Sequence, residues 1–274
     1  MIGFNMLGQL GQLGNQMFQV ASLRGIAANN EYNYCFPIHQ NVFTDALGNK
    51  LRIDVHNAFT LQGVDPLNIQ LIDKDRPTVE EGTYHFDEKL FNNCPDWVNL
   101  QGFFQSEKYF LHIEDTIRSM FTFRPEVLEP CKDMINTVEN PVSLHIRRGD
   151  YLTNHANHNN LGLDYYAKGL DHFKGRNVII FSDDPDWCKQ QELFKDDNRF
   201  LVSEGNNHYT DMCLMSLCKS HIIANSSFSW WGAWLSNSRD VVAPTKWFGP
   251  NNACLLYTSP SPRDRTRSRM PSSA

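Results

Sequence analysis

Apolar runs of strand length alternate with helical patterns through the second half of the chain. The runs lie at residues 142–146, 178–181, 200–202, 221–225 and 241–243. Between them, apolar residues recur at helical spacing near residues 163–173, from residue 187 onward, at 212–219 and at 228–235. Strands that alternate with helices form parallel sheets. The second half is therefore predicted to be an α/β unit with a parallel sheet.

The start of the chain has a related but weaker pattern. An apolar run at residues 2–7 leads to Gly8, Gly11 and Gly14, and a helical pattern follows. A strand, a glycine-rich turn and a helix open many nucleotide-binding units, but the spacing Gly-x-Gly-x-x-Gly is missing here. An ordinary strand-to-helix turn is the alternative interpretation.

The middle of the chain is the least regular part. Residues 31–100 contain only short apolar segments, broken by Asn, Asp, Pro and Gly. Helical patterns return at 113–123 and again in a segment that ends at residue 135. We therefore place the boundary between two domains at residues 136–141.

Composition restricts the class of protein. A hydrophobic content of 41% in 274 residues is that of a globular protein with one large domain or two ordinary ones. No apolar run has the length of a membrane span, and no export signal is visible at the start. The seven scattered cysteines contain no Cys-x-x-Cys pair, which favours reduced thiols in a cytoplasmic protein. A net charge of −6 argues against nucleic-acid binding.

The last residues differ from the rest of the chain. Residues 254–274 hold five serines, three prolines and four arginines, with Asp264 as the only acid. A basic interaction arm is one interpretation. We favour another, that the segment resembles translated vector or adapter DNA, and we expect it to be foreign or disordered and to carry no function.

The most informative chemistry follows the strand at residues 142–146. A histidine, two arginines, a glycine, an aspartate and a tyrosine come within the segment from His145 to Tyr151. Paired guanidinium groups match phosphate oxygens, and Gly149 lets the backbone turn sharply beside them. A surface turn with solvated charges is the alternative. Because ligands bind at the carboxyl ends of parallel strands, the position favours a phosphorylated ligand.

Two further polar segments follow predicted strands and should lie at the same edge of the sheet. Ser226 and Ser227 begin a helix, whose free N–H groups attract phosphate. With the arginines they would form a pyrophosphate clamp that stabilises a departing nucleoside diphosphate. Asp183 and Asp184 could bind a metal or cap a helix. His145 could orient a neighbour or act as a base, and the tryptophans at 230, 231 and 234 are expected in the core.

Four segments together identify a resemblance. The chain resembles glycosyltransferase family 11, the α-1,2-fucosyltransferases that use GDP-fucose. The matching segments are Gly11 to Gln19, Gln101 to Phe110, His145 to Tyr151, and Asp211 to Leu235. The match extends from about residue 2 to 250. The chain departs from the family pattern in two places. The first turn carries a duplicated Gly-Gln-Leu. The tail stands where the family has its closing strand and helix, so the fold is expected to be truncated.

The resemblance implies a GT-B fold of two Rossmann-like domains that face a cleft. Residues 1–140 would form the acceptor side and 141–253 the GDP-fucose-binding domain. The implied activity is inverting, metal-independent transfer of L-fucose, without a cofactor, to the 2-hydroxyl of a galactose-containing glycan acceptor in glycan biosynthesis. Transfer to another position or acceptor, or a non-catalytic nucleotide- or sugar-binding module, is the alternative. A cytoplasmic location is expected, and peripheral membrane association stays open.

The resemblance also implies roles for residues. The arginines would contact the pyrophosphate, the start of the last helix would hold phosphate and nucleotide, the Asp pair would lie near guanine or ribose, and the first turn would line the cleft. The donor-binding residues expected on this basis are His145, Arg147, Arg148, Asp183, Asp184, Asn225, Ser226, Ser227, Phe228, Gly14, Asn15 and Gln16. Arg147 is also expected to be catalytic. Asp150 and His155 are the candidates for the general base, and the choice between them stays open.

Overall fold

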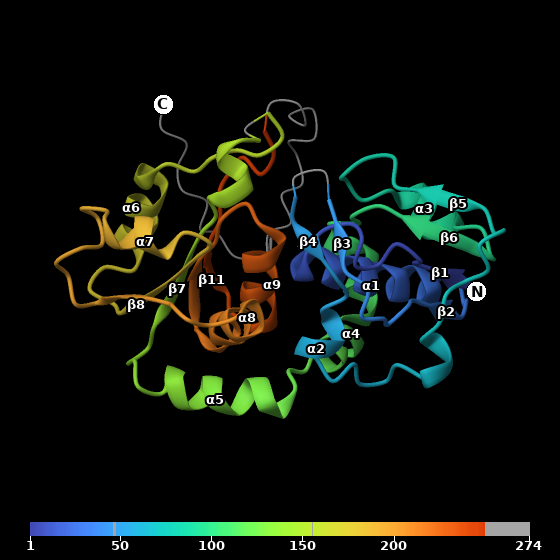
Figure 1. Cartoon of the computed structure of the whole chain (residues 1–274), viewed down its shortest axis with the longest axis horizontal. Coiled ribbons are helices and arrows are strands. Elements are labelled where there is room, and N and C mark those ends of the chain that lie inside the picture. Colours follow the sequence, from blue (N-terminus) through green and yellow to red (C-terminus); the bar gives the residue numbers. More distant parts are fainter. Residues whose placement is uncertain (46–47, 155, 250–274) are drawn as a thin grey trace. The chain divides into compact units, whose positions relative to one another are not determined.

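The structure is a computed structural model that describes residues 1–45, 48–154 and 156–249. The chain divides into two compact units, unit 1 from Met1 to Arg124 and unit 2 from Pro125 onward (Figure 1). The division lies earlier than the expected boundary at 136–141, because helix α5 (Pro125–Ile135) packs against helix α8 (His208–Leu217). The predicted tail at 254–274 lies outside the described residues.

Unit 1 is built on a four-stranded parallel sheet in the order β2-β1-β6-β5. Its strands are β1 (Ile2–Gly3), β2 (Tyr34–Cys35), β5 (Thr78–Glu80) and β6 (Val98–Gln101). A separate antiparallel pair joins β3 (Phe43–Thr44) to β4 (Lys50–Leu51). The helices are α1 (Leu13–Asn29), α2 (Val55–Ala58), α3 (Glu88–Asn93) and α4 (Glu114–Met120), with short 3-10 turns η1 (Pro66–Asn68), η2 (Glu107–Tyr109) and η3 (Leu111–Ile113).

Helix α1 is buried along almost its whole length and carries a polar stripe in the core. Gln16, Gln19 and Ser22 are fully buried. The Gln16 amide donates to the Arg52 carbonyl at 2.7 Å, and the Gln19 amide donates to the Gly102 carbonyl at 3.1 Å. The Gln16 amide, the Gln19 nitrogen and the Ser22 hydroxyl all have partners, as burial of polar groups requires, whereas Gln19 Oε1 has none among the described residues. The stripe fixes the loops that follow β1 and β6 onto the helix.

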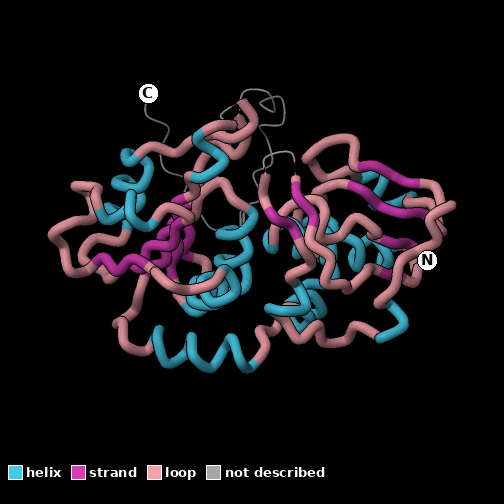
Figure 2. The backbone as a smooth tube through the Cα atoms, in the orientation of Figure 1, coloured by secondary structure: helices cyan, strands magenta, loops and turns pink. Residues whose placement is uncertain are grey.

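Unit 2 has a five-stranded parallel sheet in the order β11-β10-β7-β8-β9. Figure 2 draws its strands in magenta and the helices around them in cyan. The strands are β7 (Val142–Ile146), β8 (Val178–Ser182), β9 (Phe200–Val202), β10 (Ser220–Ile222) and β11 (Asp240–Val242). The remaining elements are η4 (Gly149–Leu152), α6 (Leu163–His172), α7 (Pro185–Lys189) and α9 (Ser227–Leu235). The alternation of strands and helices predicted from the sequence is confirmed, and Trp230, Trp231 and Trp234 are buried as expected.

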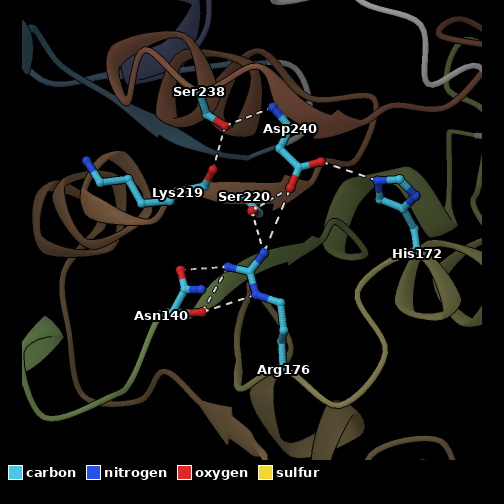
Figure 3. Close-up of polar contacts among 7 residues, drawn as sticks. All are labelled: Asn140, His172, Arg176, Lys219, Ser220, Ser238 and Asp240. Atoms are coloured by element: carbon cyan, nitrogen blue, oxygen red, sulfur yellow. Dashed lines mark hydrogen bonds and ion pairs between the residues drawn. The ribbon is translucent and has the colours of Figure 1, made fainter.

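A polar network ties the amino ends of four of these strands together (Figure 3). Arg176 donates to the Asn140 carbonyl at 2.9 Å and to the Ser220 hydroxyl at 2.7 Å. That hydroxyl donates to the Asp240 carboxylate at 2.9 Å. Because the four residues precede or begin β8, β7, β10 and β11, the network fixes the strands against one another. The network thereby also fixes the register of the strands at the opposite, carboxyl edge of the sheet.

Within the described part of the chain, no helix is long and apolar enough to cross a membrane.

Candidate functional site

The topology of unit 2 selects one point on the carboxyl edge of its sheet. From β7 the chain passes through α6 to β8 on one side, and only later returns to β10 on the other side of β7. Leu144 of β7 pairs with Ile222 of β10, so the carboxyl ends of these strands are adjacent. In open α/β sheets ligands bind where the strand order reverses in this way. The segments after β7, β8 and β10 meet here, as the sequence predicted.

Arg147 follows β7 directly and lies between two carboxylates. Its Nη2 is 2.7 Å from Asp150 Oδ1, and its Nη1 is 3.1 Å from Asp183 Oδ2. Burial alone would lower the pKa of Arg147, but the neighbouring carboxylates outweigh that effect and raise it. The guanidinium is therefore permanently charged and held in a fixed orientation.

Three contacts fix the position of Arg148. Its backbone N–H donates to Asp183 Oδ1 at 2.9 Å, and its Nε donates to Asp184 Oδ2 at 3.0 Å. Its Cζ lies 3.7 Å from the centroid of the Trp187 ring, a close cation–π contact. Asp184 also accepts from the backbone N–H of Trp187 and so caps helix α7. The helix-cap interpretation of Asp184 is confirmed, while Trp187 was missed by the sequence reasoning.

These side chains form one unit, which we call the arginine cluster: Arg147, Arg148, Asp150, Asp183 and Asp184. Two positive and three negative charges leave a net charge of −1. A guanidinium has five N–H donors, and the two ion pairs of Arg147 use only some of them. The carboxylates thus orient the arginines without occupying all their donors, and the cluster keeps donors for a doubly charged phosphate group.

Gly149 is required by the geometry of the cluster. Its φ is +22°, and a Cβ at this position would lie 2.5 Å from Asp183 Oδ2. Any side chain here would push the carboxylate away from both arginines. Among the described residues, no group of three or more His, Cys, Asp or Glu side chains could hold a metal ion. The positive groups that the structure places at this edge are the arginines.

The start of helix α9 completes the edge. Ser226 accepts from the Phe228 N–H at 3.3 Å and caps the helix, as predicted. Backbone N–H groups at the start of a helix are suited to an anion. Asn225 is 3% exposed, and its amide donates to the Asn159 and Trp247 carbonyls at 2.9 and 2.7 Å. Its side chain therefore holds neighbouring loops in place.

His145 lies beneath the cluster as a neutral ring. Burial, with a smaller effect of the Arg147 charge, lowers the pKa of His145 to about 3. The ring centroid is 5.6 Å from that of Phe228, and Nδ1 has no hydrogen-bond partner among the described residues. A ring with this pKa is a weak base near neutral pH. The arrangement favours the orienting role over the catalytic one.

Tyr151 links the parts of the site. Its hydroxyl donates to the Asn225 carbonyl at 3.0 Å, and its ring stacks on His158 at 4.0 Å between centroids. The Arg147 Cζ lies 5.5 Å from the same ring. The sequence assigned no role to Tyr151, yet its side chain joins η4 to the segment that follows β10. His155, one of the two candidate bases, lies outside the described residues.

The predicted residues of the first turn all lie in unit 1. Gly14 and Gln16 are buried in the first turn of α1, and Gln16 makes the hydrogen bonds given above. Asn15 is half-buried, and its Oδ1 accepts from Gln105 Nε2 at 2.9 Å. Contact of these three residues with a donor stays a prediction.

Unit 1 contains a carboxylate that sequence reasoning missed. Glu81 follows β5, and its Oε2 accepts from the backbone N–H groups of Phe103 and Phe104 at 2.9 and 2.8 Å. Its other oxygen is buried without a partner among the described residues. Burial raises the pKa of Glu81 from 4.5 to about 7, although the two N–H donors oppose this effect. The preceding strand, Thr-Val-Glu, has no apolar run, so the sequence carried no signal for this carboxylate.

The raised pKa of Glu81 predicts a pH-dependent stability. Because the folded state binds this proton more tightly than the unfolded state, stability is lost as pH rises from 4.5 through about 7. We expect Glu81→Gln, which cannot ionise, to gain up to about 3 kcal/mol relative to wild type between about pH 5 and pH 8. Urea unfolding of both proteins at the two pH values measures the difference. An equal pH dependence in the two proteins would contradict the assignment.

Comparison with known sequences supplies the family context. The model of Glycosyl transferase family 11 matches residues 2–248. The chain is 36% identical over 266 residues to an alpha-1,2-colitosyltransferase of Escherichia coli, covering 87% of this chain and 90% of that protein. It is 40% identical over 189 residues to the O-antigen biosynthesis glycosyltransferase WbnK of E. coli, covering 61% and 62%. A Bos taurus galactoside alpha-(1,2)-fucosyltransferase 1 is 23% identical, covering 91% and 71%.

Solved structures show the same fold at low sequence identity. POFUT1 in complex with GDP matches with a TM-score of 0.52 and 11% identity, covering 88% of this chain and 97% of that one. Fucosyltransferase NodZ from Bradyrhizobium matches with a TM-score of 0.51 and 13% identity, covering 82% and 89%. The expected GT-B fold is confirmed by these neighbours and by the parallel sheet of each unit.

Proposed function

The chain belongs to glycosyltransferase family 11, and from this premise we propose that it transfers L-fucose from GDP-fucose to the 2-hydroxyl of a galactose-type acceptor with inversion. The observation that carries the proposal is the arginine cluster at the point where the strand order of unit 2 reverses. Two oriented guanidinium groups and a helix start lie at one edge. These are the groups that a departing nucleoside diphosphate needs.

The first task of the site is to stabilise the leaving group. When the bond between the anomeric carbon and the diphosphate oxygen breaks, negative charge accumulates on the β-phosphate. Arg147 would stabilise this negative charge directly, because Asp150 and Asp183 fix the orientation of its guanidinium before the donor binds. Donors that need no reorganisation stabilise a transition state most effectively. The N–H groups at the start of α9 would bind the other phosphate.

The second task is to remove the proton of the attacking hydroxyl. In a single displacement the acceptor oxygen forms its bond to the anomeric carbon as GDP leaves on the opposite side, and the proton passes to a base. Asp150 fits this role because Oδ1 pairs with Arg147 while Oδ2 has no partner among the described residues. The side chain is 22% exposed, which gives the second oxygen access to a substrate. His155 is the other candidate.

A second candidate donor is favoured by one comparison. The E. coli relative that is 36% identical over 266 residues is a colitosyltransferase. Colitose is fucose without its 3-hydroxyl group, so both GDP-sugars present the same diphosphate to the arginine cluster. Selection between them would depend on contacts to the sugar ring.

Product analysis tests the proposed function. The protein is incubated with lactose and either GDP-fucose or GDP-colitose, with a chelator present throughout. We expect transfer that does not need a metal ion, and a product whose linkage by NMR is to the 2-hydroxyl of galactose. Preference for GDP-colitose would select the second candidate. Absence of transfer with intact binding of GDP would instead indicate a nucleotide-binding module.

A further inference from the structure

Unit 1 has its own point of strand-order reversal. From β1 the chain passes through α1 to β2 on one side, whereas β6 and β5 lie on the other side of β1. Gly3 of β1 pairs with Asn99 of β6, so the carboxyl ends of these two strands are adjacent. By the same rule that locates the arginine cluster, this edge is a ligand-binding position. The segments that follow the strands here are Phe4 to Gln12 and Gly102 to Gln105.

An oriented amide lies at this point. Gln105 Nε2 donates to Asn15 Oδ1 at 2.9 Å, across 90 residues of sequence. This bond fixes the direction of the Gln105 amide, and its carbonyl oxygen Oε1 has no partner among the described residues. Gly11 makes the arrangement possible, because its φ is +81° and a Cβ there would lie 2.1 Å from the Asn15 amide nitrogen. The amide therefore offers a fixed hydrogen-bond acceptor at the edge.

An aromatic pair lies on the same loop system. The rings of Tyr84 and Phe103 stack with centroids 5.9 Å apart and planes at 24°. Both side chains are half-buried, so each keeps part of its surface open to solvent. Phe103 lies two residues before Gln105 in the chain. A flat aromatic surface together with a fixed amide suits a pyranose ring, whose C–H groups form an apolar face and whose hydroxyls project around it.

The loop that carries these groups is held rigidly. Glu81 binds the N–H groups of both Phe103 and Phe104, and the Ser22 hydroxyl donates to the Phe104 carbonyl at 3.1 Å. Phe104 is buried with a φ of +50°, a conformation that costs free energy for a residue other than glycine. Such conformations persist where the surroundings fix them, and they concentrate at ligand sites. Gln105 is the next residue along this backbone.

The three side chains described above differ in charge from the arginine cluster. Gln105, Tyr84 and Phe103 are all uncharged, whereas the edge of unit 2 presents two arginines. We propose that Gln105, Tyr84 and Phe103 form a site for the neutral sugar of the acceptor, in which Gln105 Oε1 accepts a hydrogen bond from a hydroxyl and the aromatic pair packs against the C–H face. The description of this sugar as the acceptor rests on the proposed function.

Two variants separate the parts of the site. Gln105→Leu removes the fixed acceptor, and loss of one hydrogen bond should raise the KM for lactose about tenfold. Tyr84→Ala should raise it at least as much, whereas Tyr84→Phe retains the stacking surface and should stay within about twofold of wild type. Gln70→Leu is the matched control, because within the part of the chain that the structure describes the exposed Gln70 amide bonds only to the Leu67 carbonyl of its own turn, at 2.6 Å. We expect no change in that protein.

Direct binding distinguishes failure of this site from failure of the proposed function. Saturation-transfer NMR with lactose alone reports binding without any donor, and calorimetry with GDP reports the nucleotide site. Loss of the lactose signal in Gln105→Leu and Tyr84→Ala, with GDP affinity retained, supports the site even if no fucosyl transfer is detected. Lactose binding that is absent in wild type, or unchanged in both variants, would overturn it. A parallel loss of GDP affinity would also overturn it, by assigning the edge to the donor.

Discussion

Replacing Arg147 with alanine should abolish detectable GDP binding and lower kcat/KM for transfer by at least about a thousandfold. The reason is a double effect on charge. The variant loses the guanidinium that faces the leaving diphosphate, and it leaves Asp150 and Asp183 without their cation. The net charge of the arginine cluster falls from −1 to −2, and the guanidinium donors that offset the carboxylates toward an anionic ligand are lost. Calorimetry with GDP and initial rates at saturating acceptor measure the two effects.

Arg147→Lys extends the test. A lysine keeps the charge but replaces the planar fork with a single ammonium group, which cannot reach both carboxylates and a phosphate in the same geometry. We expect it to recover only a small part of the lost affinity. Arg199→Ala is the matched control, because Arg199 also pairs with a carboxylate, Asp197, at 2.7 Å and lies on an aromatic ring, Phe200, away from the cluster. GDP affinity near wild type in Arg147→Ala would remove the basis of the proposed function.

The elements of unit 2 could be predicted because burial imposes a simple pattern on them. The residues of β7 are buried along its whole length, and the strand predicted at 142–146 matches it in both bounds. Helix α1 was harder to delimit. Gln16, Gln19 and Ser22 interrupt its apolar pattern, yet they are buried because loops distant in sequence supply their hydrogen-bond partners. A pattern of single residues contains no information about such partners.

Local sequence patterns are limited in the same way in what they predict about the candidate functional site. The strand-end rule brought the arginines, the Asp pair and the serines to one edge, and the structure places them together. It did not show that Asp183 and Asp184 pair with the arginines, which lie about 35 residues earlier. Trp187 was missed because its role depends on the position of Arg148 above its ring. Strand ends can be predicted from a local pattern, whereas contacts between distant segments depend on tertiary packing.

Asp150→Asn should lower kcat by about a hundredfold or more while changing GDP affinity less than tenfold. Asparagine keeps an oxygen that can accept from Arg147 Nη2, now at 2.7 Å from the carboxylate, so the arginine stays oriented. It cannot take up a proton, so the general-base contribution is lost. The profile of kcat against pH should therefore lose its acidic limb, since that limb reports protonation of the base.

Asp183→Asn provides the comparison that separates a base from an orienting group. Asp183 also pairs with Arg147, at 3.1 Å, and it accepts the Arg148 N–H, but Gly149 packs directly on its Oδ2. This carboxylate is therefore committed to the arginines through both oxygens, and its replacement should weaken GDP binding while the acidic limb of the pH profile persists. If Asp150→Asn behaved in the same way, Asp150 would only hold Arg147. The base would then have to be sought elsewhere, first at His155.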